Sequence, residues 1–191
     1  MRAFRLSLLL ALPLVFSACD SLDPDPQDVR RGFIERVVIT QIPLTNPNSS
    51  PPGEGWDGGG AEDADVYFRL LGVNDSPDII NGEEDGVVAV GDASSTDGTF
   101  GGVGSADLPL VYTLDAATVP ASEITVLDRT LRLEVKDDDS PGSTDDVMAV
   151  SQAFTLFDQI PSTLPNDRRV AFTVTNAAGT MTAQITVRYE R

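Results

Sequence analysis

The sequence predicts an all-β protein, an eight-stranded antiparallel β-sandwich that follows a short N-terminal leader. From Phe33 onward, apolar residues recur with a period of two, which is typical of half-buried strands, and helical spacing is scarce. The alternating runs are short, and clusters of Gly, Pro, Asn and Asp, which favour turns, separate them. Because no helical segments alternate with the strands, a sandwich is favoured over a helix-covered parallel sheet.

Eight segments carry the strand pattern. In Leu131–Lys136 apolar residues occupy every second position and charged residues occupy the others. Met181–Tyr189 shows a similar alternation, and Asn176–Gly179 supplies a turn that joins it to the strand before it. The predicted strands are Ile34–Ile42, Asp65–Leu71, Gly86–Val90, Leu108–Leu114, Leu131–Val135, Val147–Leu156, Val170–Val174 and Met181–Tyr189. The stretches predicted as long or irregular loops are Thr45–Asp63, Asn74–Asp85 and Gly91–Asp107.

The N-terminus has the organisation of an export signal. A positive start is followed by the apolar run Leu6–Phe16, which is too short to span a bilayer comfortably. The residues that follow, Phe16-Ser17-Ala18-Cys19, resemble the lipobox of bacterial lipoproteins. This resemblance implies a signal peptide at 1–18, an acylated Cys19, a flexible tether over 19–32 and a sandwich over 33–191. An ordinary signal peptide with an unmodified cysteine is the alternative.

Composition excludes several classes of function. The chain of 191 residues has 13 Lys plus Arg against 30 Asp plus Glu, a net charge of −17, no His and one Cys. Without His there is no Ser-His-Asp triad and no His-based metal site, and we expect no enzyme. Nucleic acid is not an expected partner, because phosphate binding needs a basic patch. The abundance of Asp over Glu and a single lysine, Lys136, suggest a halophilic source.

Two aspartate clusters carry the candidate chemistry. The first runs from Asp57 to Asp65 at the start of a predicted strand, and the second runs from Asp137 to Asp146 between two predicted strands. On an extended backbone Asp137 and Asp139 project to the same side, and the loop after them lets Asp146 fold back. Calcium takes six to eight oxygen ligands, many of them carboxylates. Either these carboxylates stay spread in water or a cation gathers them.

The two clusters resemble the calcium-binding loops of the C2 domain, the phospholipid-binding β-sandwich of synaptotagmin and protein kinase C. The first, Asp57 followed by Asp65-Val66-Tyr67-Phe68-Arg69-Leu70, matches the family's Asp, loop and strand-opening Asp-Pro-Tyr-Val-Lys-Val. The second, Val135-Lys136-Asp137-Asp138-Asp139 followed by Asp146-Val147-Met148-Ala149, matches Val-x-Asp-x-Asp and Asp-Phe-Met-Gly. The resemblance covers roughly residues 33–191 and implies five calcium ligands: Asp57, Asp65, Asp137, Asp139 and Asp146. Asp63 and Asp145 are neighbours that could substitute.

The chain departs from membrane-docking members of that family. Its loop tips, Gly58–Gly60 and Ser140–Thr144, are small and polar, and a single lysine cannot form a basic groove. Calcium binding is therefore expected without peripheral docking to anionic lipid.

The sequence therefore predicts a lipoprotein of the bacterial cell envelope, exported and anchored in a membrane through Cys19. Its C2-like sandwich is expected to bind calcium and to have a binding or structural role, with an envelope protein or a glycan as partner. One alternative is an interaction module of the same fold whose metal loops are not functional and whose acidity reflects salt. A carboxylate-based glycan hydrolase is the third hypothesis, although no pair among the eight Glu residues is singled out by spacing.

Overall fold

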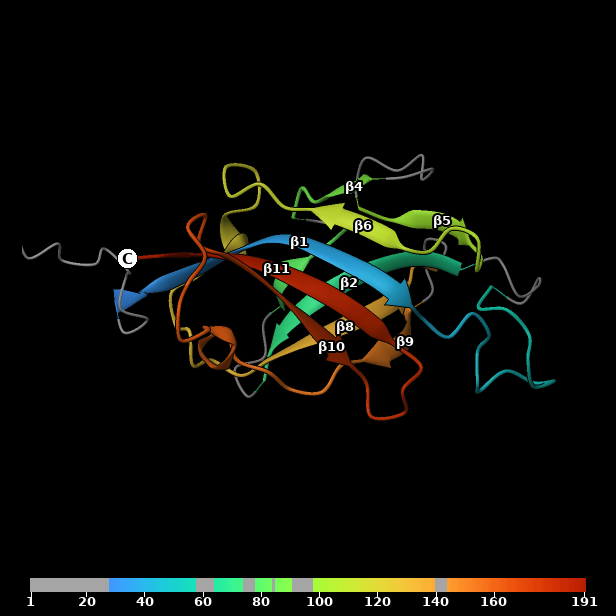
Figure 1. Cartoon of the computed structure of the whole chain (residues 1–191). Coiled ribbons are helices and arrows are strands. Elements are labelled where there is room, and N and C mark those ends of the chain that lie inside the picture. The colour runs from blue at the N-terminus through green and yellow to red at the C-terminus, as the bar shows by residue number, and fades with distance from the viewer. Residues whose placement is uncertain (1–27, 58–63, 74–77, 84, 91–97, 140–143) are drawn as a thin grey trace, which may run out of the picture.

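Residues 28–57, 64–73, 78–83, 85–90, 98–139 and 144–191 are described by the structure, a computed structural model. Within these ranges eleven strands form two antiparallel sheets that enclose one core (Figure 1). The prediction of an antiparallel β-sandwich is confirmed. The predicted signal peptide, Cys19 and the tether as far as residue 27 lie outside the described residues.

The larger sheet is built around the longest strand, β1 (Arg31–Gln41), which begins two residues before the predicted start of the domain. The strand order is β10 (Arg169–Thr175), β11 (Thr182–Glu190), β1, β6 (Leu110–Thr113) and β4 (Val88–Val90). The two-residue strand β7 (Glu123–Ile124) also pairs with β1. The register of β1 against β11 shifts between Ile34 and Arg36, which leaves Glu35 in a bulge.

The second sheet carries the two predicted aspartate clusters. Its order is β3 (Asp78–Asn81), β2 (Ala64–Gly72), β8 (Leu131–Asp137) and β9 (Asp146–Val150), and β5 (Phe100–Val103) also pairs with β2. Because β2, β8 and β9 are neighbours, the start of β2 lies beside the end of β8 and the start of β9. The two clusters, far apart in the sequence, therefore meet at one end of the sandwich.

Alternate residues of the long strands supply the core. On β2, Val66, Phe68 and Leu70 are buried between the sheets, as the period of two predicts. Tyr112 of β6 links the two sheets, because its ring packs edge-to-face on Phe68 at 4.9 Å and its hydroxyl donates to the Val66 carbonyl at 2.9 Å. A polar group in the core is thus hydrogen-bonded rather than buried without a partner.

The predicted number of strands was wrong. The described residues contain eleven strands rather than eight, because β3, β5 and β7 fall outside the eight predicted segments. Each is four residues or shorter, too short for alternation to be recognised. Of the three, β5 and β7 pair with strands distant in sequence, and β3 pairs with the strand directly before it, β2. The predicted strand Val147–Leu156 is also shorter, since β9 ends at Val150 and the Ser151 hydroxyl then accepts the Leu133 amide proton at 2.9 Å.

Candidate metal centre

Asp137 occupies a core position at the end of β8. Leu131, Leu133 and Val135 point into the core, and Asp137 continues the same row with no exposed surface. One carboxylate oxygen, Oδ1, accepts a hydrogen bond from the Asp65 amide at 2.7 Å. The other, Oδ2, is buried and has no hydrogen-bond partner among the described residues. A buried, ionised carboxylate that is only half satisfied is costly unless a cation or a proton compensates it.

The electrostatic surroundings of Asp137 favour the protonated form when no cation is present. The pKa of Asp137 is raised to about 7, chiefly by burial and further by the nearby charges of Asp57, Asp139 and Asp65, against the lowering effect of the hydrogen bond from the Asp65 amide. The pKa of Asp139 is also raised, by burial first and then by the charges of Asp146 and Asp145, against a lowering effect of Lys136. Both shifts have the direction expected where acids gather at a partly buried site.

Two further carboxylates converge on Asp137. Asp57, Asp137 and Asp139 each offer an oxygen, and these three oxygens lie within 4.8 Å of one another. Two oxygens that bind one calcium ion at about 2.3–2.6 Å cannot be more than about 5 Å apart, so the spacing fits a shared ion. The unpartnered Oδ2 of Asp137 is the feature that a metal would satisfy. The residues present therefore fit calcium.

The loop before β2 is fixed by Trp56, next to Asp57. The indole is buried in the core, and its Nε1 donates to the Pro43 carbonyl at 2.8 Å. Trp56 therefore packs this loop against the core. Asp57 itself is exposed, so the packed tryptophan holds a solvent-facing carboxylate above the buried Asp137.

Asp65 and Asp146 lie next to this group of three but are not members of it. The Asp65 carboxylate accepts a hydrogen bond from the Gly102 amide of β5 at 2.9 Å. Its backbone supports the site instead, since its amide binds Asp137 and its carbonyl accepts the Asp138 amide proton at 2.7 Å. Asp146 pairs with Asp137 across the β8–β9 ladder, and its carboxylate lies 3.4 Å from the Asn46 side-chain amide. Asp63 lies outside the described residues.

A second acidic group, formed by Glu83, Asp138 and Asp145, has oxygens within 4.8 Å of one another. Lys136 already supplies a positive charge to this group. Its Nζ lies 3.5 Å from the Asp145 carboxylate and 5.7 Å from the centre of the Tyr67 ring. The Tyr67 hydroxyl donates to Asp145 at 2.6 Å. Although burial raises the pKa of Asp145, this hydrogen bond and Lys136 lower it below its usual range. Asp145 is therefore committed to a salt bridge.

Glu83 was not among the predicted site residues. It lies in the turn after β3, and the pairing of β3 with β2 is what brings this turn toward the end of the sheet. The sequence reads there as an acidic loop, and no local pattern distinguishes Glu83 from its neighbours. Only the pairing of β2 with both β3 and the distant strand β8 could have revealed it.

Comparisons with known proteins give fold neighbours but no family assignment. No protein-family model and no curated protein matches the sequence. Similar solved structures are a C2 domain (10% identity, 84% of this chain and 98% of that chain, TM-score 0.39) and a C2 domain of a plant extended synaptotagmin 1 (11%, 84% and 92%, TM-score 0.37). A third is a C2 domain protein from Ramazzottius varieornatus (13%, 85% and 91%, TM-score 0.38). TM-scores below 0.5 do not establish membership of that family, and the assignment of the sandwich stands on the two sheets themselves.

No helix within the described ranges is long and apolar enough to cross a membrane.

Proposed function

We propose that this protein is a lipoprotein of the bacterial cell envelope whose β-sandwich binds calcium at one end, with a binding or structural role rather than a catalytic one. The observation that carries the calcium assignment is the buried, half-satisfied carboxylate of Asp137, which Asp57 and Asp139 approach. The anchor rests on the lipobox-like sequence ending at Cys19.

Asp57, Asp137 and Asp139 would hold the ion, and Asp146 and Asp65 would support the site from the adjoining strands. Calcium there would neutralise the mutual repulsion of the carboxylates and tie the loop that contains Asp57 to the end of β8. Further ligands would come from carbonyl groups or water, because calcium takes six to eight. The second acidic group offers less to a metal, since Lys136 already neutralises part of it.

Calcium-dependent stability tests this proposal. Binding to the folded state alone should raise the free energy of unfolding by about 2.7 kcal/mol at a hundredfold excess of calcium over its Kd. We expect a Kd of about 10⁻⁴–10⁻³ M and a smaller effect of magnesium, which demands a tight octahedron and retains its waters. Thermal unfolding should be followed at high, constant NaCl, so that screening of the surface charge is already saturated.

The matched variants separate a metal site from screening. Replacing Asp137 and Asp139 together by Asn should abolish the calcium increment. A double control, Asp128→Asn with Asp167→Asn, removes the same charge elsewhere on the surface and should retain the increment. Equal shifts with calcium and magnesium in all three proteins would show that the effect is general screening. The interaction-module hypothesis would then replace the calcium hypothesis.

The anchor is tested independently of the metal. A Cys19→Ala variant should leave the membrane fraction or accumulate as an unprocessed precursor, because multiple acyl chains are what make such anchoring stable. Mass spectrometry of the mature N-terminus should find a lipid-modified Cys19. An unmodified N-terminus would refute the lipoprotein proposal and leave the calcium test unaffected.

A further inference from the structure

The outer face of the larger sheet gathers arginines around a pocket of about 550 Å³. Cross-strand pairing places Arg169 of β10 beside Arg188 of β11, and Arg188 beside Phe33 of β1. Arg36, on the far side of the β1 bulge, also lines the pocket. The volume lies within the range of about 300–1,000 Å³ that small-molecule sites occupy.

The pocket differs in charge from the rest of the chain. Its lining holds three arginines and two carboxylates, Glu35 and Asp115, so that three positive and two negative charges leave a net of +1. The whole chain carries −17. The pocket is therefore positively charged on a protein that is negative as a whole, which favours the approach of a small anion to it.

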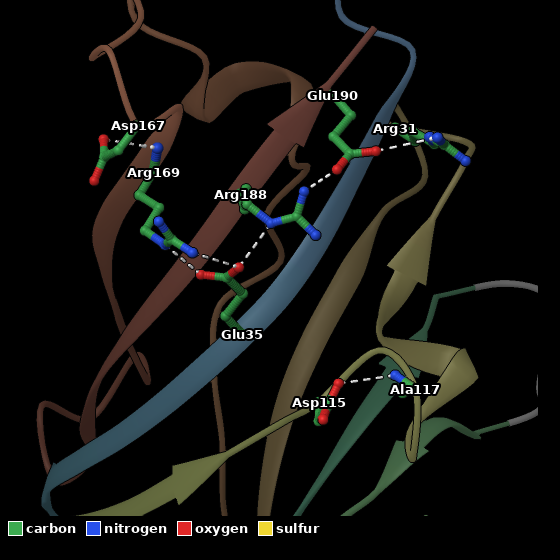
Figure 2. A network of polar contacts seen from close by, with 8 residues as sticks. All are labelled: Arg31, Glu35, Asp115, Ala117, Asp167, Arg169, Arg188 and Glu190. Atoms are coloured by element: carbon green, nitrogen blue, oxygen red, sulfur yellow. Dashed lines mark hydrogen bonds and ion pairs between the residues drawn. The ribbon is translucent and has the colours of Figure 1, made fainter.

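Glu35 orients two of the arginines. Figure 2 shows its carboxylate between Arg169 and Arg188, with Arg169 donating through Nε at 2.6 Å and Nη2 at 3.1 Å, and Arg188 through Nε at 2.7 Å. Burial raises the pKa of Glu35, but the hydrogen bonds from the two arginines outweigh it and hold the pKa below its usual range. Arg188 is further fixed by Glu190 and by the Phe33 ring, 4.7 Å from its guanidinium carbon. The guanidinium groups are thus preorganised.

Several donors remain available after these contacts are made. Arg36 is exposed and makes no ion pair or side-chain hydrogen bond with any described residue. Within the described ranges, the hydrogen bonds of Arg169 leave its Nη1 unused, and those of Arg188 leave its Nη2 unused. Ser122, which lines the same pocket, is 1% exposed, and its hydroxyl has no hydrogen-bond partner among the described residues. A buried hydroxyl without a partner, beside unused guanidinium donors, indicates a place for an external polar ligand.

The two carboxylates limit what that ligand can be. One oxygen of Asp115 accepts the Ala117 amide proton at 2.9 Å, and the other remains available as an acceptor within the described ranges (Figure 2). A compact anion without hydroxyl groups would be repelled by Asp115 and Glu35, whereas hydroxyl groups would donate to them. We propose that this pocket binds a small anion that carries hydroxyl groups, of the sugar-acid or sugar-phosphate class, with its anionic group on the arginines.

This pocket lies on the larger sheet, whereas the candidate calcium site lies at the end of the other sheet. The proposal depends neither on calcium binding nor on the lipid anchor. Calorimetric titration of the full-length protein in calcium-free buffer of low ionic strength tests it, with glucuronate and glucose 6-phosphate as probes. At least one of them should saturate the protein at or below about 10 mM and bind more tightly than glucose or inorganic phosphate. The tighter of the two identifies the anionic group that the pocket prefers.

Two variants locate the binding. Arg36→Gln should weaken it about tenfold without changing the melting temperature, because Arg36 makes no contact that the fold needs. Ser122→Ala should weaken it about threefold or more. The matched control is Arg132→Gln on β8 of the other sheet, which should bind normally. Arg132 is also exposed and has no ion pair among the described residues.

Three results would overturn the proposal. The first is that neither anionic probe binds, and the second is that glucose or inorganic phosphate binds as tightly as both. The third is that Arg36→Gln binds as the wild type does, which would place any binding elsewhere on the protein.

Discussion

Replacing Asp137 by Asn separates the charge of the buried carboxylate from its shape. Asn keeps an oxygen for the Asp65 amide at 2.7 Å and removes the charge at the unpartnered position. With a pKa of about 7 in the folded state against an ordinary 3.8, ionisation of Asp137 opposes folding. The raised folded-state pKa means that the penalty begins near pH 4, grows as the pH rises, and is complete above pH ~7. At about 1.4 kcal/mol per pKa unit it reaches at most about 4 kcal/mol at pH ~8 and falls below about 2 kcal/mol at pH ~5.

In the absence of calcium, Asp137→Asn should therefore be more stable than the wild type at pH ~8, and its advantage should shrink at pH ~5. Urea unfolding followed by the fluorescence of the single tryptophan, Trp56, measures both conditions with one probe. Calcium should narrow the difference at pH ~8 by about 2.7 kcal/mol at a hundredfold excess over its Kd, because only the wild type gains from it. An equal gain at both pH values, or a destabilised variant at pH ~8 without calcium, would refute the assignment of a buried, charged Asp137. Asp128→Asn, at an exposed position, serves as the control.

Three further perturbations test the fold and the arginine pocket. Gly98 adopts φ +100°, and a Cβ there would lie 1.8 Å from the Gly82 carbonyl oxygen. Gly98→Ala should therefore lower the free energy of unfolding, measured with urea, by about 3 kcal/mol or more. A loss below about 1 kcal/mol would contradict this packing. Tyr112→Phe removes the hydrogen bond to the Val66 carbonyl and should cost about 1 kcal/mol in the same assay, whereas no loss would show that water replaces the hydroxyl. Glu35→Gln removes a carboxylate with a lowered pKa, whose stabilisation is present above its ordinary pKa and lost as the pH falls through the folded value. The variant should thus be about 1 kcal/mol less stable at neutral pH and equal to the wild type well below pH ~4, and a deficit that persists in acid would contradict the ion pairs.

Alternation predicted the long strands because each of them has one face in the core and one in solvent. The same rule explains why Asp137 and Asp139 come together, since residues two apart near the end of a strand share a side. It could not assign Asp65, which opens a strand and whose carboxylate turns to the Gly102 amide of β5. Strand β5 has two central glycines and no alternation of apolar residues, and it is ordered by its pairing with β2.

The arginine pocket shows the other limit of sequence reasoning. Glu35 is 134 residues from Arg169 and 153 from Arg188, and only the registers of β10, β11 and β1 bring the three together. In the bulge, Glu35 has no partner residue on β11. The sequence does not reveal this bulge, because Glu35 simply follows two apolar residues there. Composition showed that cations are few, but their clustering is a property of strand order.

The burial of Lys136 has a practical consequence for chemical labelling. It carries the only ε-amino group of the chain, its side chain is 9% exposed, and Tyr67 and Asp145 cover it. An amine-directed reagent therefore has one covered target in the folded domain besides the α-amino group at the N-terminus. Because reaction at Lys136 requires its ammonium group to leave Tyr67 and Asp145, the rate of its acylation reports how often these two contacts open. Conjugation through amines would thus record local opening around Lys136 in the folded domain.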